Sequence, residues 1–237
     1  MMNIVVICLG GINDCFVASS VNKGLKRLHP ESNISWVVDN NDAVDLLSHS
    51  KNIKQITCDD PEDSFDLLIN LSGSPYILQQ ISAKAKIGLF SGAGHDRYYD
   101  NLYGDQNIDM NLFQIYYRLA GMSWRGEGYD VCYYPKTKTK QSRVGLAIAN
   151  ANLRNFVSEK LNLELSKLWI VPYKKSILKR IDEVNRCKVV VTDDLLTLHI
   201  ALYLRKFVHF LKAMPFNTKI ETFNSGQVYE VPLRYIR

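Results

Sequence analysis

Apolar runs of strand length alternate with helical spacing along the first half of the chain. The first run, Asn3–Cys8, has the length and continuity of a buried parallel strand. Apolar residues at helical spacing follow from Phe16 to Leu28, and His29-Pro30 ends that pattern. Further strands are predicted at Ile34–Val38, Ile53–Thr57, Phe65–Leu71 and Ala85–Phe90, and further helices at Ala43–Leu47, Tyr76–Ala83 and Met110–Gly121. This alternation predicts a parallel sheet with right-handed crossovers.

The alternation restarts after a polar stretch without periodicity, Lys136–Gln141. Strands are predicted at Arg143–Ala149, Leu168–Val171, Lys188–Thr192 and Phe207–Leu211, with helices at Asn152–Leu161, Ser176–Asn185 and Leu195–Leu204, before a mixed pattern at Thr222–Pro232. We interpret Lys136–Gln141 as a linker. The sequence therefore predicts an α/β fold of two Rossmann-like parallel-sheet domains, residues 1–135 and 136–237, which face each other across a cleft.

Composition narrows the class of protein. The 237 residues are 46% hydrophobic and 22% charged, which excludes disorder, collagen and coiled coil as the main state. No apolar run approaches the roughly 18 residues that a membrane span needs. The apolar start has no basic region before it, so we interpret it as a strand and predict a cytoplasmic protein. The five cysteines are then reduced thiols; they show neither CxxC nor zinc spacing, so we expect no metal site.

Charge divides the chain at the same place as the linker. Residues 1–135 hold 10 Lys and Arg against 16 Asp and Glu, whereas residues 136–237 hold 19 against 8. A basic second half indicates either that an anion is bound there or that the surface is simply solvated. Nucleic acid is not expected as a partner, because no stacking platform, helix-turn-helix, finger or RNP pattern accompanies the basic residues.

Candidate chemistry in the first half lies where the first strand gives way to a helix. Asp14 stands at this point, which in an open parallel sheet is the edge where ligands bind. An Asp here can also be an ordinary N-cap. Gly10 and Gly11 allow close backbone approach to a ligand, or serve a plain tight turn. With Ile12 and Asn13 they do not form a GxGxxG dinucleotide motif.

Candidates in the second half occupy similar positions. Asp193 and Asp194 follow an apolar strand and precede a helix that contains His199. They are candidates for capping the helix or for binding a sugar hydroxyl, and His199 for packing or catalysis. Arg154 lies in the first turns of another helix, where it could grip a diphosphate or simply face solvent.

Four segments together resemble the lipopolysaccharide heptosyltransferase family, glycosyltransferase family nine, which has the GT-B fold. The family's opening turn and following helix are similar to Leu9–Asp14 (LGGIND) and Leu25–Pro30 (LKRLHP). Its Asp-hydrophobic-hydrophobic-Asp-Leu strand is similar to Asp66–Leu71 (DLLINL). Its motif Asn-Asp-Thr-Gly-Pro-x-His-Leu-Ala is similar, without a gap, to Asp193–Ala201 (DDLLTLHIA).

The resemblance implies an inverting glycosyltransferase that needs neither metal nor cofactor. Asp14 would be the general base, and Gly10, Gly11 and Asn13 would line the cleft. The donor would be a nucleotide-diphosphate sugar, ADP-heptose in much of the family, bound by Arg154, Asp194 and His199. The family's Lys-x-Trp-Pro motif falls more loosely on Arg154–Phe156. The acceptor would be a glycan, a lipid-linked molecule or a protein.

This chain departs from the family at the expected donor site. Leu195-Leu196 stand where the family has Thr-Gly beside the donor phosphates, and Asn13 stands where it has Gly. The C-terminal domain is also shortened. Two functions therefore stay open: sugar transfer, or binding and assembly by a relative that has lost catalysis.

Overall fold

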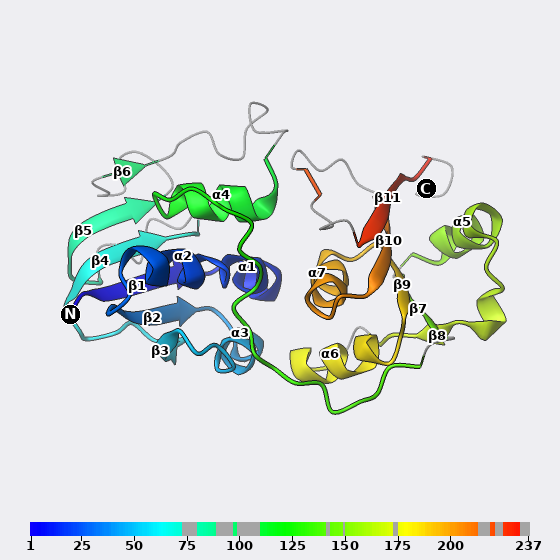
Figure 1. The fold of residues 1–237 in the computed structure, drawn as a ribbon, viewed down its shortest axis with the longest axis horizontal. Coiled ribbons are helices and arrows are strands. Elements are labelled where there is room, and N and C mark those ends of the chain that lie inside the picture. Colours follow the sequence, from blue (N-terminus) through cyan, green and yellow to red (C-terminus); the bar gives the residue numbers. More distant parts are fainter. Residues whose placement is uncertain are drawn as a thin grey trace. The chain divides into compact units, whose positions relative to one another are not determined.

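The first apolar run forms an interior strand, β1 (Asn3–Cys8), of a six-stranded sheet in the computed structural model (Figure 1). Ile4–Cys8 are buried, because strands flank β1 on both sides and the sheet is covered. The structure describes residues 1–72, 80–88, 97–98, 110–140, 143–148, 150–172, 175–212, 219–220 and 225–232; at 97, 98, 151 and 165 it describes the backbone only.

All described pairings in this first sheet are parallel, in the order β3-β2-β1-β4-β5-β6. The other strands are β2 (Asn33–Val38), β3 (Ile53–Thr57), β4 (Phe65–Asn70), β5 (Ala83–Gly88) and β6 (Arg97–Tyr98). The chain runs outward from β1 to β3, then returns to place β4 on the other side of β1. The order therefore reverses between β1 and β4, and such a switch point is where open α/β sheets bind ligands.

The helix expected across residues 16–28 is in fact two helices, α1 (Gly11–Ala18) and α2 (Val21–Leu28). The break falls at Ser19-Ser20, where backbone bonds span three residues, as in Ser20 N–H to Val17 O (3.2 Å). The Ser19 hydroxyl donates to Phe16 O (2.7 Å) and accepts from the backbone N–H of Asp130 (3.0 Å). A long-range contact thus fixes the break.

Two further helices complete the described part of the first unit, α3 (Asn41–Leu47) and α4 (Leu112–Leu119). A capping box starts α4: the Asn111 side chain accepts from Gln114 N–H, and the Gln114 side chain accepts from Asn111 N–H. Helix α4 packs against α1 and α2. The Tyr117 hydroxyl donates to Ser20 O (2.6 Å) and so anchors α4 at the break between those helices.

Some helix and strand boundaries in the structure differ from the predicted ones. Ala83, expected at the end of a helix from Tyr76, is the first residue of β5, and residues 76–79 lie outside the described part. Strand β5 also begins two residues before the strand expected at Ala85–Phe90, whose last two residues are likewise outside the description. The mixed C-terminal pattern contains a strand, β11 (Gly226–Glu230).

The second sheet has the order β11-β10-β9-β7-β8, again with parallel pairings throughout the described residues. Its strands before β11 are β7 (Val144–Ala147), β8 (Trp169–Ile170), β9 (Val189–Thr192) and β10 (Phe207–Lys212), joined through α5 (Ala151–Leu161), the 3-10 turn Leu165–Lys167, α6 (Ile177–Asn185) and α7 (Leu195–Tyr203). The order reverses between β7 and β9, which is the switch point of this sheet. Both halves are thus parallel α/β units, and the predicted fold class is confirmed.

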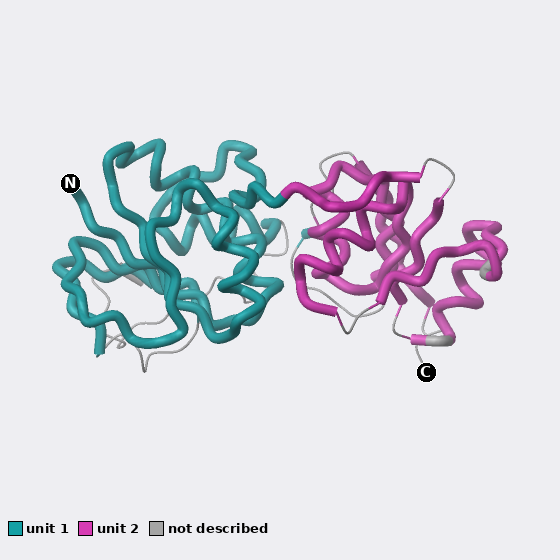
Figure 2. The backbone as a smooth tube through the Cα atoms, turned by 90° about the horizontal axis from the view of Figure 1, so that it is seen from below, with its two compact units in different colours: residues 1–133, 217–219 teal, residues 134–216, 220–237 magenta. Residues whose placement is uncertain are grey.

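The chain divides into two compact units between Tyr133 and Tyr134 (Figure 2). Lys219 belongs to the first unit, where it forms a parallel bridge with Asn111. The stretch expected as a linker contacts α6 of the second unit as far as it is described: Lys136 N–H donates to Asp182 Oδ1 (2.7 Å), and Lys140 N–H donates to Arg186 O (3.0 Å). None of the helices in the described parts of the chain has the length and apolar character to cross a membrane.

Candidate functional site

Asp14 lies at the switch point of the first sheet, in the helix that follows β1. The N-cap of α1 is Gly10, and no side chain caps this helix. Asp14 belongs to the first turn of α1, so the alternative reading of Asp14 as the N-cap is wrong. The Asp14 carboxylate therefore does not cap its own helix and can interact with other groups.

A tyrosine from α4 holds the Asp14 carboxylate. The hydroxyl of Tyr116 donates to Asp14 Oδ1 at 2.5 Å, and the Tyr116 side chain is buried. The other oxygen lies over Gly10, where a Cβ atom would stand only 2.1 Å from Asp14 Oδ2. Gly10 is thus required by the position of the carboxylate.

The pKa of Asp14 is raised above its ordinary value. Burial is the main cause, the Tyr116 hydrogen bond opposes it, and the charge of Asp39 adds to it. A partly desolvated carboxylate with a raised pKa is a better proton acceptor than a solvated one. Asp14 is therefore suited to act as a general base.

The turn before Asp14 supplies the remaining predicted residues. Gly11 has φ of 80°, a left-handed conformation that favours glycine, and a Cβ there would meet nothing within 4 Å. Asn13 Oδ1 is buried and has no hydrogen-bond partner among the described residues. An unsatisfied acceptor is uncommon in a folded protein and is often found at functional sites. The structure thus brings Gly10, Gly11, Asn13 and Asp14 together in one turn.

Two helices of the second unit begin at its switch point. Ala147 and Thr192 are paired at the ends of β7 and β9, and the Thr192 hydroxyl donates to Ala147 O (2.8 Å) and accepts from Asp194 N–H (3.0 Å). The side chains of Asn150 and Asp194 cap α5 and α7 just beyond these strand ends. Helix N-termini carry partial positive charge, so this edge of the sheet favours an anion.

The Asp194 carboxylate is already engaged within the fold. Its Oδ2 accepts from Thr197 N–H (2.7 Å) and pairs with the guanidinium of Arg180, which comes from α6 and is 6% exposed. Arg180 also donates to the Thr197 hydroxyl. This ion pair neutralises Asp194, so its charge does not oppose an anion at the edge of the sheet.

His199 lies deeper in the same helix. Its side chain is 4% exposed, and burial lowers its pKa to about 4, although the charge of Asp194 acts in the opposite direction. His199 is therefore neutral at pH 7. Leu196 is also buried, whereas Leu195 is half-buried.

Arg154 is exposed on α5, one turn into the helix. Because α5 follows β7 and α7 follows β9, Arg154 and Asp194 belong to neighbouring segments of one switch point. Arg154 is free to move toward a ligand, unlike Asp194 and His199. Throughout the described residues, no group of three or more His, Cys, Asp or Glu side chains could hold a metal ion.

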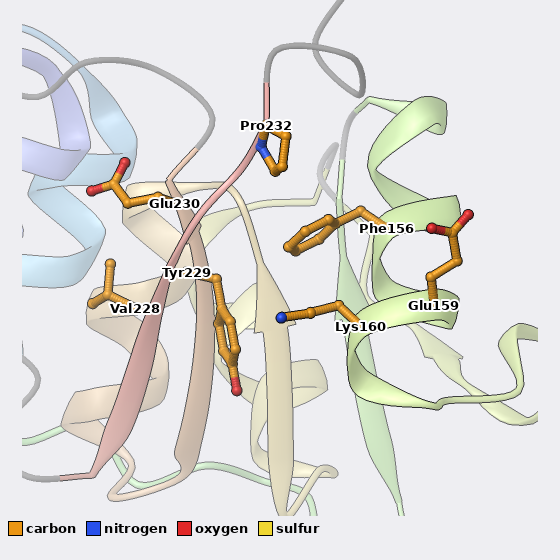
Figure 3. A pocket seen from close by; sticks show the side chains of 7 residues that line it. All are labelled: Phe156, Glu159, Lys160, Val228, Tyr229, Glu230 and Pro232. Carbon is orange, nitrogen blue, oxygen red and sulfur yellow. The ribbon is translucent and has the colours of Figure 1, made fainter.

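A pocket of about 500 Å³ lies on the same unit, between α5 and β11 (Figure 3). It is lined by Phe156, Glu159, Lys160, Val228, Tyr229, Glu230 and Pro232. Phe156 and Lys160 point from α5 toward Tyr229 (Figure 3). The aromatic walls suit a planar group, whereas the charged lining residues, one lysine and two glutamates, do not favour an anion.

Sequence reasoning missed two residues that position the site, Tyr116 and Arg180. Tyr116 occurs among apolar residues of an amphipathic helix, and its partner Asp14 is 102 positions away. Arg180 occurs in a basic stretch typical of a solvated helix face. No local signal distinguishes either residue, because each depends on a tertiary contact.

Comparison with known proteins identifies the fold of the chain through solved structures, not through sequence. No protein-family model matches the chain, and no curated protein matches it in sequence. Solved structures do match. The glycosyl transferase family 9 structure from Veillonella parvula DSM 2008 matches 97% of this chain and 86% of its own, with a TM-score of 0.70 and 14% identity.

Two E. coli structures match over a similar extent. ADP-heptose lps heptosyltransferase II matches 98% of this chain and 91% of its own, with a TM-score of 0.67 and 11% identity. Heptosyltransferase WaaC with ADP-2-deoxy-2-fluoro heptose matches 98% of this chain and 94% of its own, with a TM-score of 0.64 and 11% identity. The chain therefore has the GT-B-like fold of these glycosyltransferases.

Proposed function

We propose that this GT-B-like chain is a glycosyltransferase that transfers a sugar, with inversion, from a nucleotide-diphosphate sugar to a hydroxyl group. The first unit would serve the acceptor and the second the donor. The observation that carries the proposal is the Asp14 carboxylate, held by Tyr116 at the switch point of the first sheet. Likeness to the heptosyltransferases supports a hexosyl or heptosyl donor. The acceptor would be a glycan, a lipid-linked molecule or a protein in the cytoplasm.

The chemistry follows from a carboxylate with a raised pKa. Asp14 would take the proton of the acceptor hydroxyl while that oxygen attacks the anomeric carbon of the donor. The new bond from carbon to the acceptor oxygen forms as the bond to the diphosphate breaks, and the nucleoside diphosphate leaves with the electron pair. Attack from the face opposite the leaving group inverts the anomeric centre.

The diphosphate would be held at the switch point of the second sheet. The N-termini of α5 and α7 supply partial positive charge, and Arg154 supplies a mobile guanidinium. Asp194 and His199 would shape this region from within the fold, through the contact with Arg180 and through burial. No cofactor and no metal are part of the proposal.

A screen of nucleotide sugars by thermal shift tests the proposal. A donor at one hundred times its dissociation constant is expected to stabilise the protein by about 2.7 kcal/mol. Transfer is then measured by release of nucleoside diphosphate. Binding without transfer to any acceptor would favour the alternative, a degenerate relative that binds or assembles, for which Leu195-Leu196 is the sequence argument. No binding by any nucleotide sugar would contradict the donor assignment.

Replacing Arg154 with alanine is expected to weaken donor binding by about 1–3 kcal/mol, because a charge-assisted contact to the diphosphate is lost. Calorimetry with the donor found in the screen measures the change. Lys160→Ala is the matched comparison, since it removes a cation from the same helix inside the α5–β11 pocket. A loss of affinity in Lys160→Ala but not in Arg154→Ala would indicate that the donor binds in the α5–β11 pocket instead.

Replacing Tyr116 with phenylalanine is expected to shift the acid limb of the kcat/KM profile to higher pH. The Tyr116 hydrogen bond lowers the pKa of Asp14, so its removal raises that pKa, and the base becomes protonated at a higher pH. Carboxyl carbon NMR of Asp14 gives the same pKa without any substrate. An unchanged pKa of Asp14 in this variant would show that the Tyr116 ring packs against its neighbours but its hydroxyl does not affect the carboxylate.

A further inference from the structure

The start of the second sheet carries a row of cations. Arg143 directly precedes β7, Lys188 precedes β9, and Arg205 stands two residues before β10. Lys167 stands two residues before β8. Because the strands are parallel, the residues before them all lie at one edge, the amino edge. This edge is opposite the carboxyl ends, where the proposed donor site lies.

Backbone hydrogen bonds hold these residues side by side. Lys188 N–H donates to Arg143 O (2.9 Å), and Phe207 N–H donates to Lys188 O (3.3 Å). Lys140 extends the row, since its N–H donates to Arg186 O at the end of α6. The side chains of Lys140 and Lys188 are exposed. We call the surface formed by Lys140, Arg143, Lys167, Trp169, Lys188, Arg205 and Phe207 the basic edge.

Described acidic residues near the basic edge cancel only part of its charge. Glu183 is paired with Lys175 and Arg186, and Glu164 is paired with Lys167. Lys140, Lys188 and Arg205 form no ion pair with any residue that the structure describes. The basic edge therefore has a net positive charge available to a partner.

Large apolar side chains accompany these cations. Trp169 is 36% exposed, Ile170 is 54% exposed and Phe207 is 40% exposed. The Arg143 guanidinium lies 4.2 Å from the centre of the Trp169 ring. Exposed tryptophan among Lys and Arg is the composition of surfaces that insert shallowly into the headgroup region of a bilayer.

We propose that the basic edge docks the protein on an anionic lipid bilayer. Lysine and arginine would face the negatively charged headgroups, each changing the affinity about five-fold, and Trp169 would enter the interfacial layer. A nucleic acid fits less well, because Arg143 covers a face of Trp169 on which a base would stack. The surface is separate from the proposed donor site, so the proposal does not depend on sugar transfer.

Sedimentation with vesicles tests the proposal on the full chain. The protein is expected to bind vesicles that contain phosphatidylglycerol and to stay unbound with pure phosphatidylcholine, with binding lost at high salt. The double substitution Lys140→Gln with Lys188→Gln is expected to weaken binding about thirty-fold, from two lost charge contacts. The matched control, Lys51→Gln with Lys54→Gln, removes two exposed cations from the first unit and is expected to bind like the parent.

Tryptophan fluorescence supplies an independent measurement. Bromine-labelled lipids in the same vesicles are expected to quench part of the emission of the parent, and this part is expected to be absent in Trp169→Phe. Equal weakening in both double variants would mean only a general charge effect and would overturn the proposal. Failure to bind anionic vesicles, together with tight binding of an oligonucleotide, would replace the lipid by a nucleic acid.

Discussion

Replacing Asp14 with asparagine is expected to lower sugar transfer by about 10²–10⁴-fold, the usual contribution of a positioned base. The substitution removes basicity but keeps an oxygen that can accept the Tyr116 hydrogen bond. Stability is expected to be equal or higher at neutral pH. The folded-state pKa of Asp14 is raised, so its ionised form costs stability above that pKa, and the neutral amide avoids this cost.

The measurement is single-turnover transfer with the donor and acceptor found by screening, beside a melting curve for each protein. Asp45→Asn is the matched control, because it makes the same chemical change at an exposed carboxylate of α3. It is expected to transfer like the parent. A stably folded Asp14→Asn protein with parental turnover would disprove the base assignment, and a large fall in melting temperature would assign Asp14 to the fold.

Replacing Arg180 with methionine is expected to lower the free energy of unfolding by about 2–3 kcal/mol. The substitution leaves the Asp194 carboxylate and the Thr197 hydroxyl without the guanidinium that they share. The Asp194 side chain is 27% exposed, so water offsets part of the loss, and the value lies below that of a fully buried pair. The melting temperature is expected to fall by roughly 5–10 °C.

Urea unfolding, followed by circular dichroism, gives the stability of each variant. Lys179→Met is the control, since it removes an exposed cation from the neighbouring position on α6. Adding Asp194→Asn to Arg180→Met is expected to restore part of the loss, because no unpaired charge then remains, while asparagine still caps α7. Equal stability of Arg180→Met and Lys179→Met would mean that the ion pair contributes nothing.

The sequence predicted most of the architecture because burial shows in local patterns. Strand β1 begins and ends at the predicted residues, because a continuous apolar run defines it, and β3 also matches its predicted bounds although only two of its five residues are apolar. The break at Ser19-Ser20 could not be predicted, because it depends on Asp130, 111 positions from Ser19. Local periodicity contains no information about such a partner.

The candidate site, like the fold, has a part that the sequence predicts and a part that it does not. Asp14 and the glycines before it were predictable, because the end of a first buried strand is a defined place in a parallel sheet. The hydrogen bonds that these side chains form could not be predicted. Tyr116, which orients Asp14, and Arg180, which neutralises Asp194, act through contacts between separate helices. Sequence therefore locates the edge where chemistry is expected, whereas tertiary contacts decide which groups at that edge are free to react.

The position of Gly10 beneath the Asp14 carboxylate also constrains how this sequence can change over evolutionary time. A mutation that adds a side chain at position 10 collides with the Asp14 carboxylate where it now lies, so the acid must turn away from this position or be replaced before the new side chain fits. The two positions are thus expected to covary among descendants of a common ancestor. Descendants that keep glycine at position 10 and an acid at position 14 are expected to hold a carboxylate in this place, whereas those with a larger residue at position 10 are expected to hold it elsewhere or not at all.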